Sequence, residues 1–174
     1  MLTLILGGAR SGKSALAERV ASDSAQEVVY VATAQAFDEE MASRIVHHRA
    51  RRPASWRSIE EPLALAATLR AHAATDRLLL VDCLTLWLSN LLGADDTGER
   101  LVAELAALFD VLPGIPGDVV FVSNEVGLGI TPLGELTRRF VDEAGRLHQA
   151  LAARCDRVIF VAAGLPMTLK GTPP

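Results

Sequence analysis

The sequence contains almost no lysine. Lys13 and Lys170 are the only two, although lysine and arginine together number 17 among the 174 residues. GTP-dependent switch proteins read guanine with an Asn-Lys-x-Asp motif, and neither lysine follows an asparagine. The motif is therefore absent, so a switch of that kind is not expected and any guanine base must be recognised in another way.

Cysteines and long apolar runs are scarce as well. Cys83 and Cys155 are the only cysteines, and they lie far apart without a spacing typical of metal ligands. We expect both to be small buried residues of a protein from a reducing compartment. No apolar run approaches the roughly 18 residues of a membrane-spanning helix, and the run at 2–6 leads into a glycine loop, unlike a signal peptide. The expectation is a cytoplasmic protein without a membrane span.

Aromatic residues make up only 5% of the chain while half of it is hydrophobic, so the core must be built from Ala, Leu and Val. The net charge of −4 argues against general binding of nucleic acid or anionic membranes by the whole surface. A chain of this length is most simply one domain, 1–174, because it is large enough to bury most of its unfolded surface.

One motif stands out near the start: Gly7-Gly8-Ala9-Arg10-Ser11-Gly12-Lys13-Ser14 fits G-x-x-x-x-G-K-[S/T] at every fixed position. An apolar strand precedes it and a helical pattern follows, which is the context that this motif requires. Glycines let backbone N–H groups curl around an anion, Lys13 can reach the β- and γ-phosphates, and the Ser14 hydroxyl can ligand Mg²⁺. The motif predicts binding of a nucleoside triphosphate; the alternative is a plain glycine turn.

Apolar strand-like segments then alternate with helical ones along the chain. Near-continuous runs of Val, Leu and Ile are typical of a parallel sheet covered on both faces. The pattern predicts an α/β fold, a single RecA-like P-loop NTPase domain with a mainly parallel sheet flanked by helices. The predicted strands are 2–6, 28–32, 77–82, 119–122 and 157–162, and the predicted helices are 15–21, Asp38 to Pro53, 63–73, 84–92, 100–111 and Thr131-Pro132 to about Arg154.

Two further segments follow predicted strands. Asp82 ends the strand 77–82, where P-loop proteins place the acid that holds Mg²⁺ through water. It can equally cap the helix that begins after Cys83. The segment 123–132 contains two glycines and is interpreted as a substrate or phosphate loop, although a plain β–α connection would look much the same.

A basic segment stands out in this acidic chain, because residues 44–57 include five arginines, two histidines and no acid. At about 100° per residue, His47 shares a polar stripe with Arg44 and Arg51, whereas His48 falls near an apolar stripe. Nearby positive charge keeps an imidazole neutral and nucleophilic. The segment is compatible with a solvated helix face, a phosphate-gripping helix, or a histidine that attacks an α-phosphorus to form a phosphoramidate.

Together these residues resemble the bifunctional adenosylcobinamide kinase / adenosylcobinamide-phosphate guanylyltransferases of cobalamin biosynthesis. The resemblance extends from Leu4 to Lys170 and rests on the combination of motifs. Besides the glycine loop, the motifs are Tyr30-Val31-Ala32-Thr33-Ala34, Arg44-Ile45-Val46-His47-His48-Arg49, Arg52-Pro53-Ala54-Ser55-Trp56, Glu60, Asn124-Glu125-Val126-Gly127-Leu128-Gly129-Ile130, and Gly164-Leu165-Pro166 with Lys170.

The resemblance implies two reactions. ATP or GTP phosphorylates the aminopropanol hydroxyl of adenosylcobinamide, and GMP is then transferred from GTP to that phosphate, giving adenosylcobinamide-GDP and pyrophosphate. The guanylylated histidine maps to His47, which with Lys13 forms the catalytic pair, and Mg²⁺ is assigned to Ser14 and Asp82. The family also implies a homo-oligomer, a ring of three subunits. The remaining nucleotide contacts map to Gly7–Ser14, Ala32, Thr33, Ala34, His48, Arg49, Ala50, Arg51, Glu60 and Asp82.

Two other functions compete with this one. A monofunctional P-loop kinase for a small metabolite explains the glycine loop and Asp82, but leaves His47 as a phosphate grip. A nucleic-acid-dependent ATPase would need a broader basic surface than one short stretch.

Overall fold

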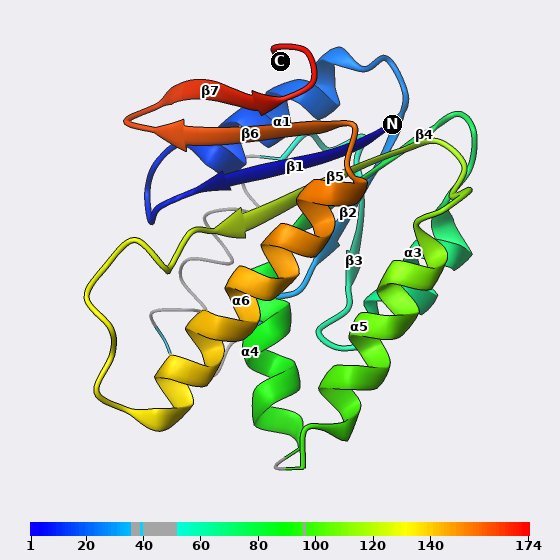
Figure 1. The fold of residues 1–174 in the computed structure, drawn as a ribbon. Coiled ribbons are helices and arrows are strands. Elements are labelled where there is room, and N and C mark those ends of the chain that lie inside the picture. Colours follow the sequence, from blue (N-terminus) through cyan, green and yellow to red (C-terminus); the bar gives the residue numbers. More distant parts are fainter. Residues whose placement is uncertain (36–38, 40–51, 96) are drawn as a thin grey trace.

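The computed structural model describes residues 1–35, 39, 52–95 and 97–174. Within these residues seven strands form one sheet in the order β3-β2-β4-β5-β1-β6-β7 (Figure 1). Neighbouring strands are parallel except β6 and β7, which are antiparallel. The strands are β1 (Leu2–Gly7), β2 (Glu27–Ala32), β3 (Arg57–Glu60), β4 (Arg77–Asp82), β5 (Asp118–Asn124), β6 (Arg157–Ala162) and β7 (Leu165–Lys170).

Helices cover both faces of this sheet (Figure 1). Successive residues of a strand point to opposite faces, so β1 directs Leu4 and Leu6 into one hydrophobic core and Ile5 into the other. Central strands are therefore apolar on both sides, which explains the near-continuous apolar runs. On one face lies α1 (Lys13–Asp23), and on the other lie α3 (Leu65–His72), α4 (Leu84–Ala94), α5 (Glu99–Val111) and α6 (Glu135–Arg154).

The predicted α/β class with a mainly parallel sheet is confirmed, and each of the five predicted strands is found within two residues of its expected bounds. Cys83 and Cys155 are free and buried, as predicted. Burial raises the pKa of the Cys83 thiol to about 11 and that of Cys155 to about 12. Both thiols are thus neutral core residues.

Two edge strands have no counterpart among the predicted strands. The short strand β3 contains a single apolar residue, Ile59, and β7 is exposed along its whole length. Neither strand is buried on two faces, so neither shows the apolar run by which the other five are recognised.

The last helix begins later than predicted. Thr131-Pro132 indicates its start, but α6 begins at Glu135, after Gly134 in extended conformation (φ −74°, ψ 135°). The stretch before it is largely exposed, so an extra helical turn would gain no stabilisation by packing. The Arg138 guanidinium donates instead to the carbonyls of residues 132 and 133. The helix predicted to start near Asp38 falls almost entirely outside the described residues.

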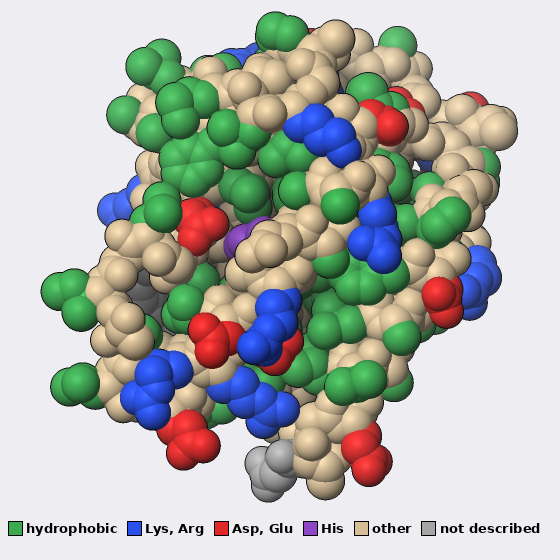
Figure 2. All heavy atoms as spheres, viewed as in Figure 1, with side chains coloured by type: hydrophobic (Ala, Val, Ile, Leu, Met, Phe, Trp, Pro, Cys, Tyr) green, Lys and Arg blue, Asp and Glu red, His purple; other side chains and the backbone are tan. Residues whose placement is uncertain are grey.

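The face covered by α4, α5 and α6 carries charged side chains of both signs with hydrophobic areas between them (Figure 2). In the described part of the chain, no helix combines the length and apolar character needed to cross a membrane. The loop between β5 and α6 bulges from the body of the fold (Figure 1). It exposes Leu128, Ile130 and Leu133 by 81, 97 and 97%, so this loop presents apolar side chains to solvent.

Candidate nucleotide-binding site

The glycine loop joins β1 to α1 and leaves no room for a side chain at its first residue. A Cβ on Gly7 would lie 2.5 Å from both Ser11 Oγ and the Val161 carbonyl oxygen. The Ser11 N–H donates to the Gly8 carbonyl at 3.2 Å, which closes a tight turn at the carboxyl end of β1. The turn delivers the backbone to the N-terminus of α1, where N–H groups without intrahelical partners favour an anion.

The hairpin between β6 and β7 braces the far end of this loop. Gly12 is the N-cap of α1 in left-handed conformation (φ 96°, ψ 2°), which glycine adopts without steric cost. The Gly164 N–H donates to the Ser11 carbonyl at 2.8 Å, and a Cβ on Gly12 would lie 3.2 Å from Gly164 Cα. The shape of the loop therefore depends on a hairpin near the other end of the described chain.

Lys13 is a buried cation at the first position of α1. It is only 8% exposed, and its ammonium donates to the Gly8 carbonyl at 3.1 Å. Burial lowers the pKa of Lys13, and the negative charge of Asp82 opposes this effect. Among the described residues Lys13 has no ion-pair partner. A phosphate group bound in the loop would supply the missing negative charge.

Asp82 stands at the carboxyl end of β4, close enough to Lys13 for its charge to act on the lysine pKa. Its Oδ2 accepts a hydrogen bond from the Tyr30 hydroxyl at 3.0 Å. Burial, and then the charge of Asp82, raise the pKa of Tyr30, so the phenol stays protonated as the donor. The N-cap of α4 is Cys83, which makes no side-chain cap bond; the Asp82 carboxylate is directed to Tyr30 and the Lys13 side of the sheet.

The sheet register brings three predicted nucleotide contacts together at this edge. Ala32 pairs with Glu60 on β3 and with Asp82 on β4. Thr33 follows directly and is fully buried. Its hydroxyl donates to the Cys83 carbonyl at 2.7 Å and accepts from the Cys83 N–H at 2.9 Å. Thr33 therefore fixes the end of β2 against the end of β4.

This edge also depends on two residues that the motifs do not reveal. Asn90 Nδ2 donates to the carbonyls of Thr33 at 2.8 Å and Pro62 at 3.1 Å. Thr85 Oγ1 accepts a hydrogen bond from the side-chain Nδ2 of Asn124 at 3.0 Å. Both are polar side chains on α4, whose sequence is otherwise largely apolar, and that contrast is the signal by which they could have been found.

The loop after β5, predicted to contact substrate or phosphate, begins beside the glycine loop. The Glu125 N–H donates to the Gly7 carbonyl at 3.0 Å, and Glu125 Oε2 lies 3.7 Å from His148 Nδ1. His148 Nε2 lies 2.7 Å from Ser123 Oγ, and burial lowers the pKa of His148 against the opposing charge of Glu125. Ser123 and His148 are buried, so they position the start of the loop. A cavity of about 220 Å³ lies between this loop and α6.

The predicted nucleophile and four predicted nucleotide contacts, His47, His48, Arg49, Ala50 and Arg51, lie outside the described residues. Arg52 is the first described residue after them, and its guanidinium carbon lies 3.5 Å from the centre of the Tyr30 ring. The Tyr30 hydroxyl donates a hydrogen bond to Asp82. Arg52 therefore lies close to Asp82, the acidic residue near the glycine loop. Ala34, two residues beyond β2, is half-buried on the other side of the gap.

The donor chemistry at this edge suits Mg²⁺. The described residues, this edge included, contain no group of three or more His, Cys, Asp or Glu side chains that could hold a metal ion by themselves. Mg²⁺ usually takes one or two protein oxygens and completes its shell with waters and substrate phosphates. The half-buried Ser14 hydroxyl and the Asp82 carboxylate are oxygen donors of that kind.

The parallel sheet, the glycine loop and the buried lysine define a P-loop NTPase fold, which implies nucleotide binding. Solved structures with this fold include the RadB recombinase. The match covers 91% of this chain and 73% of the recombinase chain, with a TM-score of 0.54 and 21% sequence identity. A second is the type III secretion ATPase EscN of enteropathogenic Escherichia coli. That match covers 93% of this chain and 43% of the EscN chain, with a TM-score of 0.58 and 15% sequence identity. At these identities the likeness concerns the fold alone.

The sequence shows the family. Residues 3–169 match the cobinamide kinase / cobinamide phosphate guanyltransferases, and the chain belongs to that family. It is 65% identical to the bifunctional adenosylcobalamin biosynthesis protein CobP of Pseudomonas aeruginosa, over 99% of both chains. It is 41% identical to the corresponding CobU of Escherichia coli K12, over 98% of this chain and 100% of the other. The predicted bifunctional transferase family is confirmed.

Proposed function

We propose that this chain performs both family reactions on adenosylcobinamide at the carboxyl edge of its sheet. ATP or GTP first phosphorylates the aminopropanol hydroxyl. GMP is then transferred from GTP to the new phosphate, giving adenosylcobinamide-GDP and pyrophosphate. The observation that carries the proposal is the match of residues 3–169 to a family named for both activities.

In the kinase step the glycine loop holds the triphosphate. The loop backbone and the α1 N-terminus bind the phosphate oxygens. The Lys13 ammonium lies beside the phosphoryl group that is transferred and stabilises its negative charge. Ser14 and Asp82 would hold Mg²⁺, which neutralises phosphate charge when it is bound. The buried Lys13 without an ion-pair partner among the described residues supports this role.

In the guanylyl step His47 is the nucleophile. A bond forms between an imidazole nitrogen and the α-phosphorus of GTP while the α–β anhydride bond breaks and pyrophosphate leaves. The phosphate of the cobinamide then attacks the same phosphorus and the phosphorus–nitrogen bond breaks. Five peptide units, the separation of His47 from Arg52, span at most about 18 Å, and Arg52 stacks on Tyr30 next to Asp82. This tether supports one site for both steps.

Nucleotide recognition is assigned to residues around the same edge. Ala32 and Glu60 lie in register there, while Thr33 fixes the strand ends through Cys83. The proposed contacts are Gly7–Ser14, Ala32, Thr33, Ala34, His48, Arg49, Ala50, Arg51, Glu60 and Asp82.

We also propose that the chain assembles as a homotrimer, as the resemblance implies. The three apolar side chains exposed on the loop between β5 and α6 support a contact of this kind, because exposed apolar groups mark interaction surfaces. Sedimentation should give about three times the 18.6 kDa of one chain; a single 18.6 kDa species at micromolar concentration would contradict it.

Covalent labelling tests the guanylyl step. The protein is incubated with Mg²⁺ and GTP labelled at the α-phosphorus, then denatured. We expect label on His47 that is lost in mild acid and kept in alkali, as for a phosphorus–nitrogen bond. His47→Asn should lose the label and GMP transfer but keep kinase activity. His48→Asn, and His72→Asn at the end of α3 as a matched control, should keep the label.

Two outcomes would overturn this assignment. Label that persists in His47→Asn and disappears in His48→Asn would exchange the roles of the two histidines. A protein that phosphorylates adenosylcobinamide but never acquires acid-labile label or releases pyrophosphate would be the monofunctional kinase.

A further inference from the structure

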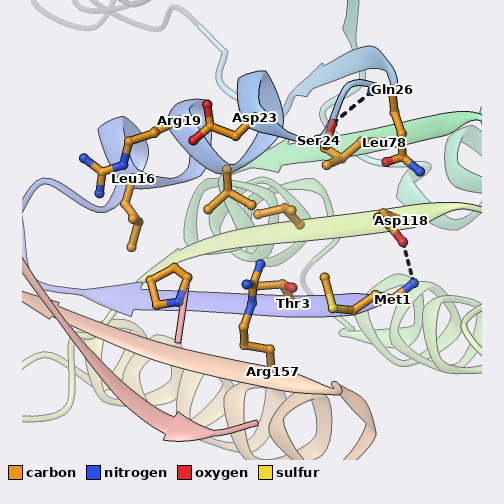
Figure 3. Close-up of a pocket in the computed structure, with 13 residues that line it drawn as sticks. Met1, Thr3, Leu16, Arg19, Asp23, Ser24, Gln26, Leu78, Asp118 and Arg157 are labelled. Atoms are coloured by element: carbon orange, nitrogen blue, oxygen red, sulfur yellow. Dashed lines mark hydrogen bonds and ion pairs between the residues drawn. The ribbon is translucent and has the colours of Figure 1, made fainter. Parts of the chain in front are cut away.

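A second cavity lies on the α1 side of the sheet, at the opposite end of the strands from the glycine loop (Figure 3). Its volume is about 370 Å³, within the range of small-ligand sites. The first residues of the central strands form its floor, including Thr3 on β1, Val120 on β5 and Arg157 on β6, and α1 forms its roof. Gly7 lies four residues along β1 from Thr3, or roughly 13 Å, so the two sites are distinct.

The Arg157 side chain is largely buried at the floor of this cavity. It is 8% exposed, its Nε has no hydrogen-bond acceptor, and it pairs with no carboxylate in the described part of the chain. Its side chain extends past Thr3 toward α1 (Figure 3). The guanidinium lines the cavity, so a negative group bound there would gain a charge-assisted contact with it.

Two more residues that line the same cavity carry a buried polar atom without a hydrogen bond. Thr3 is fully buried and lies in register beside Arg157, and its hydroxyl has no hydrogen bond. Gln26 Oε1 has none either. Nine in ten or more buried polar groups in native proteins are hydrogen-bonded. The three residues that carry such atoms line one cavity, which favours a ligand with polar groups of its own.

The other charges around the cavity leave the need for an anion in place. Asp118 is already engaged, because its Oδ1 accepts from the Met1 amino nitrogen at 2.6 Å. Asp23 on α1 lies farther from Arg157 than ion-pair distance. Arg19, one turn before Asp23, adds a second cation to the wall. The remaining wall contains apolar side chains such as Leu16, together with Ser24 and Pro174.

We propose that this cavity is a binding site for a small organic anion. Its carboxylate or phosphate group pairs with the Arg157 guanidinium and accepts from the Thr3 hydroxyl. Its apolar part packs against Leu16 and Val120, and the Gln26 side-chain carbonyl accepts from a donor on the ligand. This site is independent of the nucleotide site and of the two family reactions.

The test uses probes that share one body and differ in head group: butyrate, butyl phosphate, butylammonium and butanol. Binding to the full-length protein is measured by calorimetry and by the shift in melting temperature. Butyrate or butyl phosphate should bind and raise the melting temperature, and whichever binds more tightly identifies the head group. Butanol and butylammonium should not. Absence of binding by both anions would overturn the proposal.

Variants place the anion in the cavity. Arg157→Met should weaken anion binding at least about tenfold, the loss of a charge-assisted hydrogen bond. It should leave the ligand-free protein at least as stable as before, because no ion pair among the described residues is lost. Thr3→Val keeps the shape of the side chain and should weaken binding several-fold. Anion binding unchanged in both variants would refute the site.

Matched controls separate this site from the glycine loop. Arg77 opens β4 as Arg157 opens β6, but it is paired with Glu27 at 2.9 Å, so Arg77→Met should bind the anion normally. Lys13→Ala should lose the response to GTP and keep the response to the anion, and Arg157→Met should show the reverse. An anion response that disappears with Lys13 would place the probe in the glycine loop.

Discussion

Replacing Gly12 by alanine tests how the glycine loop is held. Alanine in the left-handed conformation costs about 1–2 kcal/mol, and Gly12 has φ 96°. Its new Cβ would also lie 3.2 Å from Gly164 Cα, a backbone atom that must shift, for roughly another 1–2 kcal/mol. We expect a loss of about 3 kcal/mol, or roughly 6–12 °C in melting temperature for a chain of this size.

Gly164→Ala is the matched control, since Gly164 has φ 79° but a Cβ there would meet nothing within 4 Å. It should lose only the conformational part, about 1–2 kcal/mol. Thermal unfolding is measured with and without GTP, which at a hundred times its dissociation constant stabilises by about 2.7 kcal/mol. Gly164→Ala should keep that gain, and Gly12→Ala should lose most of it because its loop N–H groups are displaced.

The comparison has a clear refuting result. If Gly12→Ala has the melting temperature of the wild type and is still stabilised by GTP, neither the left-handed cap nor the contact with the hairpin holds the loop. If both variants lose the same stability, the contact with Gly164 contributes nothing.

Three further predictions concern buried polar groups. Lys13→Met should abolish kinase activity yet stabilise the nucleotide-free protein at pH 7. The pKa of Lys13 is lowered from 10.5, so between the folded pKa and 10.5 the unfolded chain binds more protons than the folded one. The stability of the wild type therefore rises with pH in that range. Melting curves from pH 7 to 10.5 should show that the stability advantage of Lys13→Met shrinks. The pKa of His148 is lowered from 6.5 by burial, so stability should fall as pH falls below about 6.5, and His148→Gln should flatten this slope in urea titrations. Asn90→Ala leaves two carbonyls without their donor, and should cost about 1–3 kcal/mol in urea denaturation and weaken GTP binding measured by calorimetry.

The central part of the fold was predictable because the physics there is local. Strands such as β4 are buried on both faces, so most of their side chains are apolar and the strand is recognisable as a continuous apolar run in the sequence. The glycine loop was predictable for a similar reason, since Gly7 admits no side chain. Edge strands such as β3, with one apolar residue, are specified by pairing with a neighbour and not by their own composition.

The supports of the candidate site could not be predicted from spacing. Tyr30 and Asp82 are 52 residues apart and meet only because β2 pairs with β4. The bracing of Ser11 by Gly164 arises in the same way, from a hairpin that packs on the loop. Such contacts follow from the strand order, which the apolar pattern leaves open. The place of His47 in the site stays a prediction.

The position of β1 in the sheet has a consequence for how the protein is made. Its two neighbours are β5 and β6, and the loop that it carries is held by Gly164. A ribosome that adds roughly 5–20 residues per second therefore displays β1 for on the order of ten seconds or more before either partner strand emerges. Throughout that time the apolar strand is exposed and the glycine loop has no fixed shape. Nucleotide affinity should thus appear only when the hairpin has been synthesised, which makes GTP a reporter of completed chains in stalled-ribosome experiments.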